Sequence, residues 1–179
     1  MKYPLSIRIL HWLMALLVFG MIPFGWYISE LPDGAPSHDA LFGLHMSFGQ
    51  VVLALALLRL SLRIGAGDRI PALPEQLKPL EKKAAYYSHR LLYVLLILVP
   101  IAGFVMAATD LKEHHAVFFF GLHWPPLLPQ SEVASAIAQG VHEGAAYTLL
   151  AVIGLHVAGA LKHRFIDRDQ NVDVLSRML

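Results

Sequence analysis

Residues 142–163 read HEGAAYTLLAVIGLHVAGALKH, an apolar stretch in which His142 and His156 stand fourteen positions apart. In an α-helix, which turns ~100° per residue, the two side chains return to within ~40° of each other and therefore share one face. They lie ~21 Å apart along the helix axis. One metal ion cannot bridge that distance, because a histidine nitrogen lies ~2 Å from a metal that it binds. The spacing instead suits two large planar cofactors stacked one above the other across a membrane.

The composition of the chain is typical of a membrane protein. Hydrophobic residues make up 56% of its 179 residues and charged residues 15%, whereas about 25% of the residues of a soluble domain are charged. Four apolar stretches reach the length of ~20 residues that crosses a bilayer as a helix. We predict spans at 9–28, 41–64, 86–108 and 138–162. We therefore expect an all-α fold, a four-helix bundle integral to the membrane that forms a single domain over residues 1–179.

The positive charges predict the orientation of this bundle. Lys2 and Arg8 precede the first span, which is too long for a signal peptide and has no small-residue cleavage site after it. The segment from Arg59 to Arg90, which joins the second span to the third, holds seven cations: Arg59, Arg63, Arg69, Lys78, Lys82, Lys83 and Arg90. Because cytoplasmic loops are rich in lysine and arginine, both termini and this middle loop should be cytoplasmic. The opposite side carries acidic residues, namely Glu30, Asp33, Asp39, Asp110, Glu113 and Glu132. The net charge is only +1, and no basic domain indicates nucleic acid.

This topology sorts four histidines into two pairs by depth. His11 and His156 fall at the cytoplasmic level, whereas His45 and His142 fall at the outer level. An ionisable residue inside a membrane needs a partner, and two bis-histidine haems would supply one for each pair. The alternative is that they are helix-end histidines that hydrogen-bond neighbouring carbonyl groups. The chain has no cysteine, so a haem would be held without covalent attachment.

Other residues are candidates for the surroundings of such haems. Arg59 and Arg63 stand four apart on one helix face and could pair with haem propionates, although they could equally be anchors of the positive-inside kind. His89, at the start of the third span, could donate a hydrogen bond near the inner level or simply lie at the interface. Several glycines would let rings or helices approach closely; they are Gly43, Gly49, Gly103, Gly154 and Gly159.

Six motifs spread over the chain carry a family resemblance: ILHWL (9–13), GLHMSFG (43–49), LLRLSLR (57–63), SHRLLY (88–93), VHEGAAY (141–147) and IGLHVAGALKHRF (153–165). In these the sequence resembles the bacterial di-haem cytochrome b561 family, which is related to the cytochrome b subunits of nickel–iron hydrogenases and formate dehydrogenases. The resemblance implies a multi-pass protein of the bacterial inner membrane. It also implies two non-covalent haems b, with His11, His45, His142 and His156 as axial ligands.

Among stand-alone members, the sequence most resembles the superoxide oxidase type, which takes electrons from superoxide outside and passes them to ubiquinone inside. The resemblance implies that His163 lies near the quinone, with Lys162 and Arg164 beside it; otherwise His163 is a solvated residue of a basic patch. Lys112 and His115 are the candidates for attracting superoxide. The first outer loop departs from that type, because Glu30, Asp33 and Asp39 stand where the type has arginines, and an acidic rim repels an anion.

Two other functions are weighed against a stand-alone oxidase. The same bundle could be the electron-transfer subunit of a hydrogenase- or dehydrogenase-type complex, with a partner subunit as its donor. A haem-free transporter would need discontinuous helices or repeat symmetry, and the sequence indicates neither.

Overall fold

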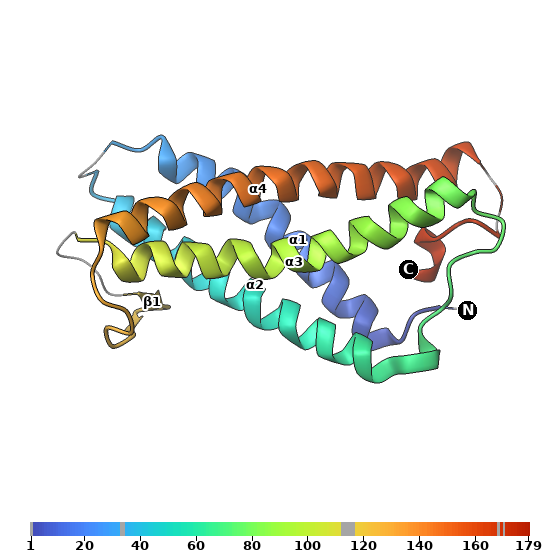
Figure 1. Cartoon of the computed structure of the whole chain (residues 1–179), viewed down its shortest axis with the longest axis horizontal. Coiled ribbons are helices and arrows are strands. Elements are labelled where there is room, and N and C mark those ends of the chain that lie inside the picture. Colours follow the sequence, from blue (N-terminus) through green and yellow to red (C-terminus); the bar gives the residue numbers. More distant parts are fainter. Residues whose placement is uncertain (1, 33–34, 112–116, 168, 170) are drawn as a thin grey trace.

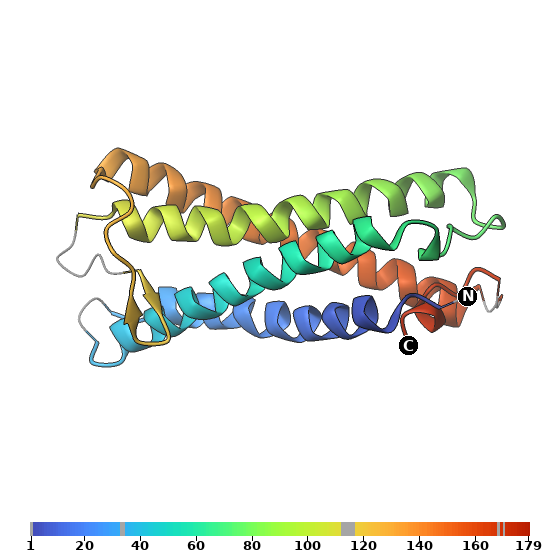
Figure 2. The same ribbon diagram turned by 90° about the horizontal axis from the view of Figure 1, so that it is seen from below.

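Four long helices form the molecule, a computed structural model that describes residues 2–32, 35–111, 117–167, 169 and 171–179. They are α1 (Leu5–Ser29), α2 (His38–Ala66), α3 (Pro79–Thr109) and α4 (Glu132–Leu161). Figures 1 and 2 show them running along the long axis of one elongated bundle. Each is long and apolar enough to cross a membrane. The predicted all-α membrane bundle is confirmed.

Helices α3 and α4 begin before their predicted spans, and at each start a polar side chain satisfies a free backbone N–H. At the start of α3, the backbone N–H of Lys78 donates to the Glu81 carboxylate at 3.0 Å, and Pro79 occupies the first helical position. At the start of α4, the Ser131 hydroxyl accepts from the N–H of Ala134 at 3.2 Å. At its other end α4 passes into a π-helical turn, Lys162–Ile166.

The bundle packs α3 along α4, α1 along α2, and α2 against α3. Its buried core is a column of small and branched side chains: Val18, Val52, Leu95, Ala145, Leu149 and Val152. Large apolar side chains point outward instead, with Leu16, Phe19 and Leu155 each more than 70% exposed. This inverted distribution suits helices surrounded by lipid, since hydrocarbon tails solvate leucine as well as a protein core does.

A two-stranded hairpin closes one end of the bundle, which we call the outer end. Strands β1 (Phe118–Phe119) and β2 (Leu122–His123) pair antiparallel. The connecting residues Phe120 and Gly121 both have positive φ, 48° and 86°, as a type I′ turn requires. The hairpin is fixed to α2, because Gln50 donates to the Phe118 carbonyl at 2.7 Å and accepts from the Trp124 indole at 3.0 Å.

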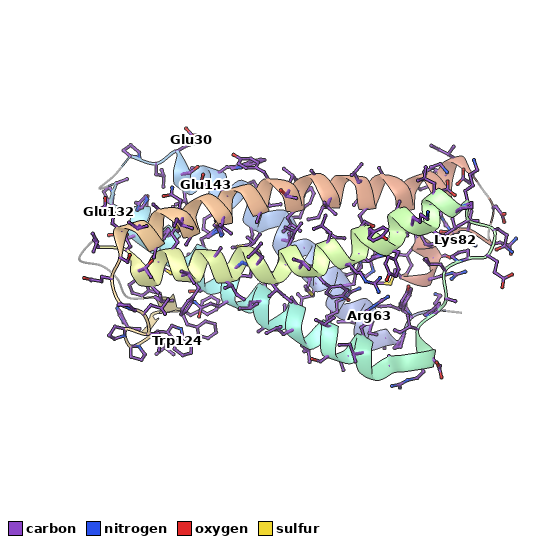
Figure 3. All side chains as sticks on the ribbon, viewed as in Figure 1. Glu30, Arg63, Lys82, Trp124, Glu132 and Glu143 are labelled. Atoms are coloured by element: carbon purple, nitrogen blue, oxygen red, sulfur yellow. The ribbon has the colours of Figure 1, made fainter. Side chains whose placement is uncertain are left out.

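Both termini lie at the opposite end, which we call the inner end (Figure 1). Short 3-10 turns at Gly67–Arg69 (η1) and Leu175–Arg177 (η3) belong to this end. The last residues are bound to the start of α1: Tyr3 N–H donates to the Arg177 carbonyl at 3.1 Å, and the Trp12 indole donates to the Met178 carbonyl at 2.9 Å. Figure 3 shows Lys82 and Arg63 toward the inner end and Glu30, Glu132 and Glu143 toward the outer end. The positive-inside rule assigns the inner end to the cytoplasm.

Candidate functional site

His45 of α2 and His142 of α4 face each other near the outer end. Their ring centroids are 6.2 Å apart and the ring planes cross at 77°. Glycines on the neighbouring helices make room for both rings. A Cβ atom at Gly103 would lie 2.9 Å from His142 Nδ1, and one at Gly25 would lie 3.1 Å from His45 Cε1. A larger residue at Gly103 would therefore collide with the ring of His142.

The space left by Gly103 lets His142 hydrogen-bond the backbone of α3. His142 Nδ1 lies 2.8 Å from the Val99 carbonyl oxygen. Because a carbonyl only accepts, Nδ1 carries the proton and donates, which leaves the Nε2 lone pair of a neutral ring free to bind a metal. The pocket beside the two rings has mainly apolar walls, which include Phe42, Met46, Phe104 and Met106.

His11 of α1 and His156 of α4 form a second pair toward the inner end. Their ring centroids are 6.3 Å apart and the planes cross at 74°. His142 and His156 stand on one uninterrupted helix, so the two pairs are separated by ~21 Å along its axis. The structure therefore brings together the histidines that the sequence sorted by depth; their role as ligands remains a prediction.

His89 of α3 also lies at the inner level, but in a different relation to His156. The centroids of these rings are 5.1 Å apart, and His89 Nδ1 lies 2.6 Å from the Ala85 carbonyl of its own helix. This ring is held by its backbone and touches the edge of the inner pair. The position of His89 therefore fits a neighbour of the inner pair better than it fits a ligand.

The two pairs fit axial ligation of an iron by two imidazoles. An iron–nitrogen distance of about 2 Å, plus about 1.2 Å from the nitrogen to the ring centre, separates two such ring centres by about 6.4 Å. The observed 6.2 and 6.3 Å agree with that value. The 5.1 Å between His89 and His156 is too short for it.

Buried polar atoms without partners give a second, independent test of the fit. Nδ1 of His45 and Nε of Arg59 are buried and make no hydrogen bond to the described residues. The Arg59 guanidinium donates to the Tyr93 hydroxyl and lies 5.4 Å from the centre of that ring. Within the described residues it has no carboxylate partner. A guanidinium whose buried Nε–H has no partner fits a carboxylate of a bound group, such as a haem propionate.

At the inner end, three of the predicted residues contact carboxylates: two of them share one network and the third forms a separate ion pair. Lys162 Nζ lies 2.9 Å from Glu81 Oε1 and 2.8 Å from Asp167 Oδ2. His163 Nδ1 lies 2.8 Å from the same Asp167 oxygen. Hydrogen bonds from Lys162 and then His163 lower the pKa of Asp167, so this carboxylate stays charged. The third residue, Arg164, pairs with Asp173.

The candidates for the outer surface are less well defined. Lys112 and His115 lie outside the described residues, as does Asp33 of the acidic loop. Of that loop's other acids, Glu30 and Asp39 are exposed.

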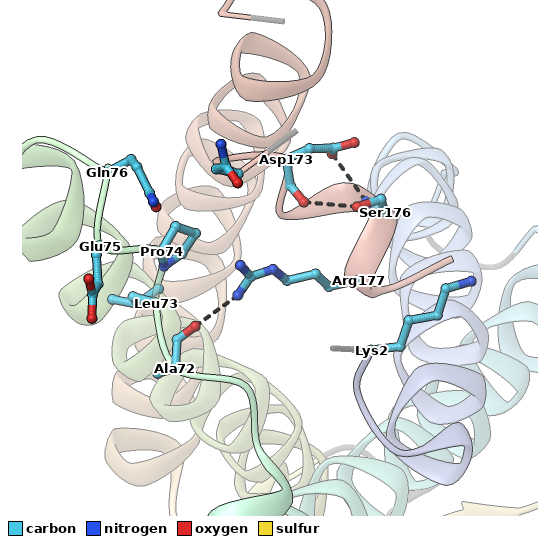
Figure 4. Close-up of a pocket in the computed structure, with 10 residues that line it drawn as sticks. Lys2, Ala72, Leu73, Pro74, Glu75, Gln76, Asp173, Ser176 and Arg177 are labelled. Carbon is cyan, nitrogen blue, oxygen red and sulfur yellow. Dashed lines mark hydrogen bonds between the residues drawn. The ribbon is translucent and has the colours of Figure 1, made fainter. Parts of the chain in front are cut away.

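The inner end also has an open polar cavity of about 520 Å³ between the middle loop and the C-terminal residues. Figure 4 shows the Arg177 side chain reaching across it to the Ala72 carbonyl, a hydrogen bond of 2.8 Å. Asp173 and Ser176 line its far side. None of the four paired histidines lines this cavity. Its size therefore does not identify it as the redox site.

Sequence reasoning missed three residues of these sites. Gly25 gave no signal, because a glycine in an apolar span is compatible with many kinds of packing. Glu81 stands among other charged residues before the third span, and nothing in that stretch indicates its partner. Asp167 stands four residues after His163, and this helical spacing could have indicated the pair. Of the glycines predicted to allow close approach, Gly103 does so, whereas Gly49, Gly154 and Gly159 have no described atom within 4 Å of an added Cβ.

Comparison with known proteins identifies the family of this chain. Cytochrome b561 homolog 2 of Escherichia coli (strain K12) is 29% identical over 178 residues, which cover 99% of this chain and 91% of that protein. The probable superoxide oxidase CybB of Yersinia pestis is 29% identical over 172 residues, 91% of this chain and 89% of that protein. Cytochrome b561 homolog 1 of Escherichia coli (strain K12) is 25% identical over 167 residues, 91% and 90% of the two chains. A family model described as prokaryotic cytochrome b561 matches residues 2–179. The chain therefore belongs to the prokaryotic cytochrome b561 family and is a multi-pass protein of the bacterial inner membrane.

Proposed function

We propose that this chain binds two haems b and carries electrons between the outer and inner faces of the membrane. Family membership implies a haem b cofactor. The observation that supports two of them is the repeated geometry: two pairs of imidazoles, 6.2 and 6.3 Å between centroids, on one bundle. His45 and His142 would hold the outer haem, and His11 and His156 the inner one.

Bound in this way, the haems supply one-electron transfer with no open iron position for oxygen. The chain's own residues set their surroundings. The Val99 carbonyl holds the ring of His142, and the positive charge of Arg59 would balance a propionate of a haem at the inner pair. Arg63 and His89 complete that inner environment, since Arg63 is the neighbouring cation four residues along α2 and His89 packs against His156.

For the reaction we propose superoxide as the donor and ubiquinone as the acceptor. The relative named as a probable superoxide oxidase supports this choice. The equation balances when two superoxide anions each lose one electron to give two O₂, while one quinone takes up the two electrons and two protons to give a quinol. Lys112 and His115 would attract the anion outside. His163 would hydrogen-bond the quinone carbonyl inside, with Lys162 and Arg164 beside it.

The acidic outer rim favours a second candidate. Glu30 and Asp39 are exposed at the outer end and repel an anionic donor. They would suit a protein donor with a basic surface, as expected if the chain is the cytochrome b subunit of a dehydrogenase-type complex. The two functions share the haem sites and the quinone site and differ only in the donor.

The test uses the purified protein with its bound haem. A superoxide-generating system should reduce the cytochrome rapidly, and ubiquinone should reoxidise it. His45→Ala should lose the outer haem, and superoxide should no longer reduce that site. Ser61→Ala should leave haem content and reduction intact, because Ser61 is an exposed residue of the same helix whose hydroxyl donates to the Leu57 carbonyl. Reduction no faster than that by an unrelated anionic reductant would contradict superoxide as donor. If a co-purifying dehydrogenase then reduced the cytochrome readily, the subunit function would replace it.

A further inference from the structure

The backbone at the end of α4 departs from the α-helix, and this departure lies beyond both histidine pairs. Residues Lys162–Ile166 form a π-helical turn, closed by the Asp167 N–H donating to the Lys162 carbonyl at 3.0 Å. Such turns are rare and often occur at functional sites. Here the turn brings the Asp167 carboxylate against two side chains at once, His163 and Lys162.

The contact between His163 and Asp167 fixes one arrangement of the ring. His163 Nδ1 lies 2.8 Å from Asp167 Oδ2, and the His163 side chain is only 11% exposed. A carboxylate accepts and does not donate, so Nδ1 carries the proton of this hydrogen bond. The remaining nitrogen, Nε2, is then the one available to a substrate.

The Asp167 carboxylate is linked through Lys162 to a second helix, α3. Lys162 Nζ contacts both Asp167 oxygens, at 2.8 and 3.2 Å, and also contacts Glu81 of α3 at 2.9 Å. Glu81 in turn is fixed by the backbone N–H of Lys78. The two carboxylates and one ammonium carry a net charge of −1, so a proton on His163 makes the group of four neutral. Asp167 is 30% exposed at the side chain and so also reaches the water of the inner side.

We propose that Asp167 is the positioning residue for His163 in quinone reduction, a proposal that rests on the quinone site proposed above. Asp167 holds the Nδ1–H, so that Nε2–H of the protonated ring donates its proton to the quinone oxygen. In the balanced step, one quinone takes up two electrons and two protons and becomes a quinol. One of the two protons comes from His163, which is reprotonated by water, and the other comes from water.

The experiment follows reoxidation of the reduced, haem-loaded protein by a short-tailed ubiquinone analogue. Asp167→Asn should lower the rate at saturating quinone by about 10- to 100-fold, while quinone affinity changes by less than about twofold. Asp167→Glu, which keeps the carboxylate, should restore part of the rate. Reoxidation by ferricyanide, which takes an electron without a proton, should be unchanged; a general structural defect would slow it too. The matched control is Asp169→Asn, which should leave the rate unchanged, because among the described residues the Asp169 carboxylate hydrogen-bonds only Asn171.

The double variant separates this proposal from the function on which it rests. If Asp167 acts through His163, then His163→Ala with Asp167→Asn should be no slower than His163→Ala alone. The proposal would be overturned if the double variant were reoxidised more slowly than His163→Ala by the same factor that Asp167→Asn shows alone. It would also be overturned if Asp167→Asn were reoxidised at the wild-type rate. If His163→Ala itself reoxidises at the wild-type rate, the quinone site is wrong and the proposal about Asp167 fails with it.

Discussion

The position of the His142 ring depends on the absence of a side chain across from it on α3. Gly103 leaves the space in which His142 Nδ1 reaches the Val99 carbonyl at 2.8 Å. The histidines themselves could be predicted from the sequence, because two of them fall fourteen residues apart in one apolar stretch. Their carbonyl partner could not, because any residue of α3 offers the same carbonyl and only the packing selects Val99.

Replacing Gly103 by alanine should displace the His142 ring. The added Cβ would lie 2.9 Å from Nδ1 and 3.0 Å from Cε1, and the crowded atoms belong to a ring rather than to a flexible chain end. We expect Gly103→Ala to lose most of the outer haem and keep the inner one, measured as haem per protein and by the cytochrome spectrum. Gly20→Ala, where an added Cβ has no described atom within 4 Å, should keep both. Full haem content in Gly103→Ala would show that the ring can shift without losing its ligand role.

Arg59 should set the potential of the inner haem. Its half-buried charge lies near His11 and His156 and would stabilise the more negative, reduced form of a haem held by them. Arg59→Gln should therefore make the midpoint potential of the inner haem more negative, by roughly tens of millivolts. The measurement is a potentiometric titration, with Arg69→Gln as control because Arg69 hydrogen-bonds carbonyls of its own helix end. An unchanged potential in Arg59→Gln would leave Arg59 as a topological anchor.

The four helices could be predicted from the sequence, but the elements at their ends could not. Long apolar stretches identify spans by length alone. The hairpin escapes notice because Phe120, rather than asparagine or glycine, takes the first positive-φ position of its turn. The π-helical turn at Lys162–Ile166 has no sequence signal either, since Glu81, which contacts Lys162 of the turn, lies far away in the sequence.

The C-terminal residues should come loose in acid. Burial opposes the charge of Asp173, but hydrogen bonds from Arg164 and Ser176 outweigh it and hold its pKa below the ordinary value of 3.8. A carboxylate with a lowered pKa stabilises the folded form above its ordinary pKa, and this contribution is lost as the pH falls through the lowered value. At neutral pH, trypsin can cleave after Arg164 only when Arg164 has come away from Asp173. We therefore expect this cleavage to be about tenfold faster in Asp173→Asn, which lacks the carboxylate, than in wild type. Asp68→Asn, in an exposed turn, should not change it. Equal cleavage in Asp173→Asn and wild type would show that the other contacts of the tail suffice.

The whole molecule is polar along its long axis, with acids exposed at the outer end and cations concentrated at the inner end. Helix α4 contributes to both candidate haem sites, because it supplies one histidine to each pair. The residues of the inner network follow at its end. The bundle therefore places a candidate haem site near each face, and the inner one lies closest to the residues proposed for the quinone. The proposed transfer of electrons from one face to the other would require a haem at both pairs.

The most direct measurement is the haem content of the purified protein, with the single variants His45→Ala and His11→Ala beside it. Two filled pairs predict about two haems b per chain, all extracted by acidified organic solvent because no cysteine holds them. Each variant should retain about one haem, and the spectrum of the haem lost should differ between them. A content of one haem per wild-type chain, or loss of the same haem in both variants, would contradict the two-pair account.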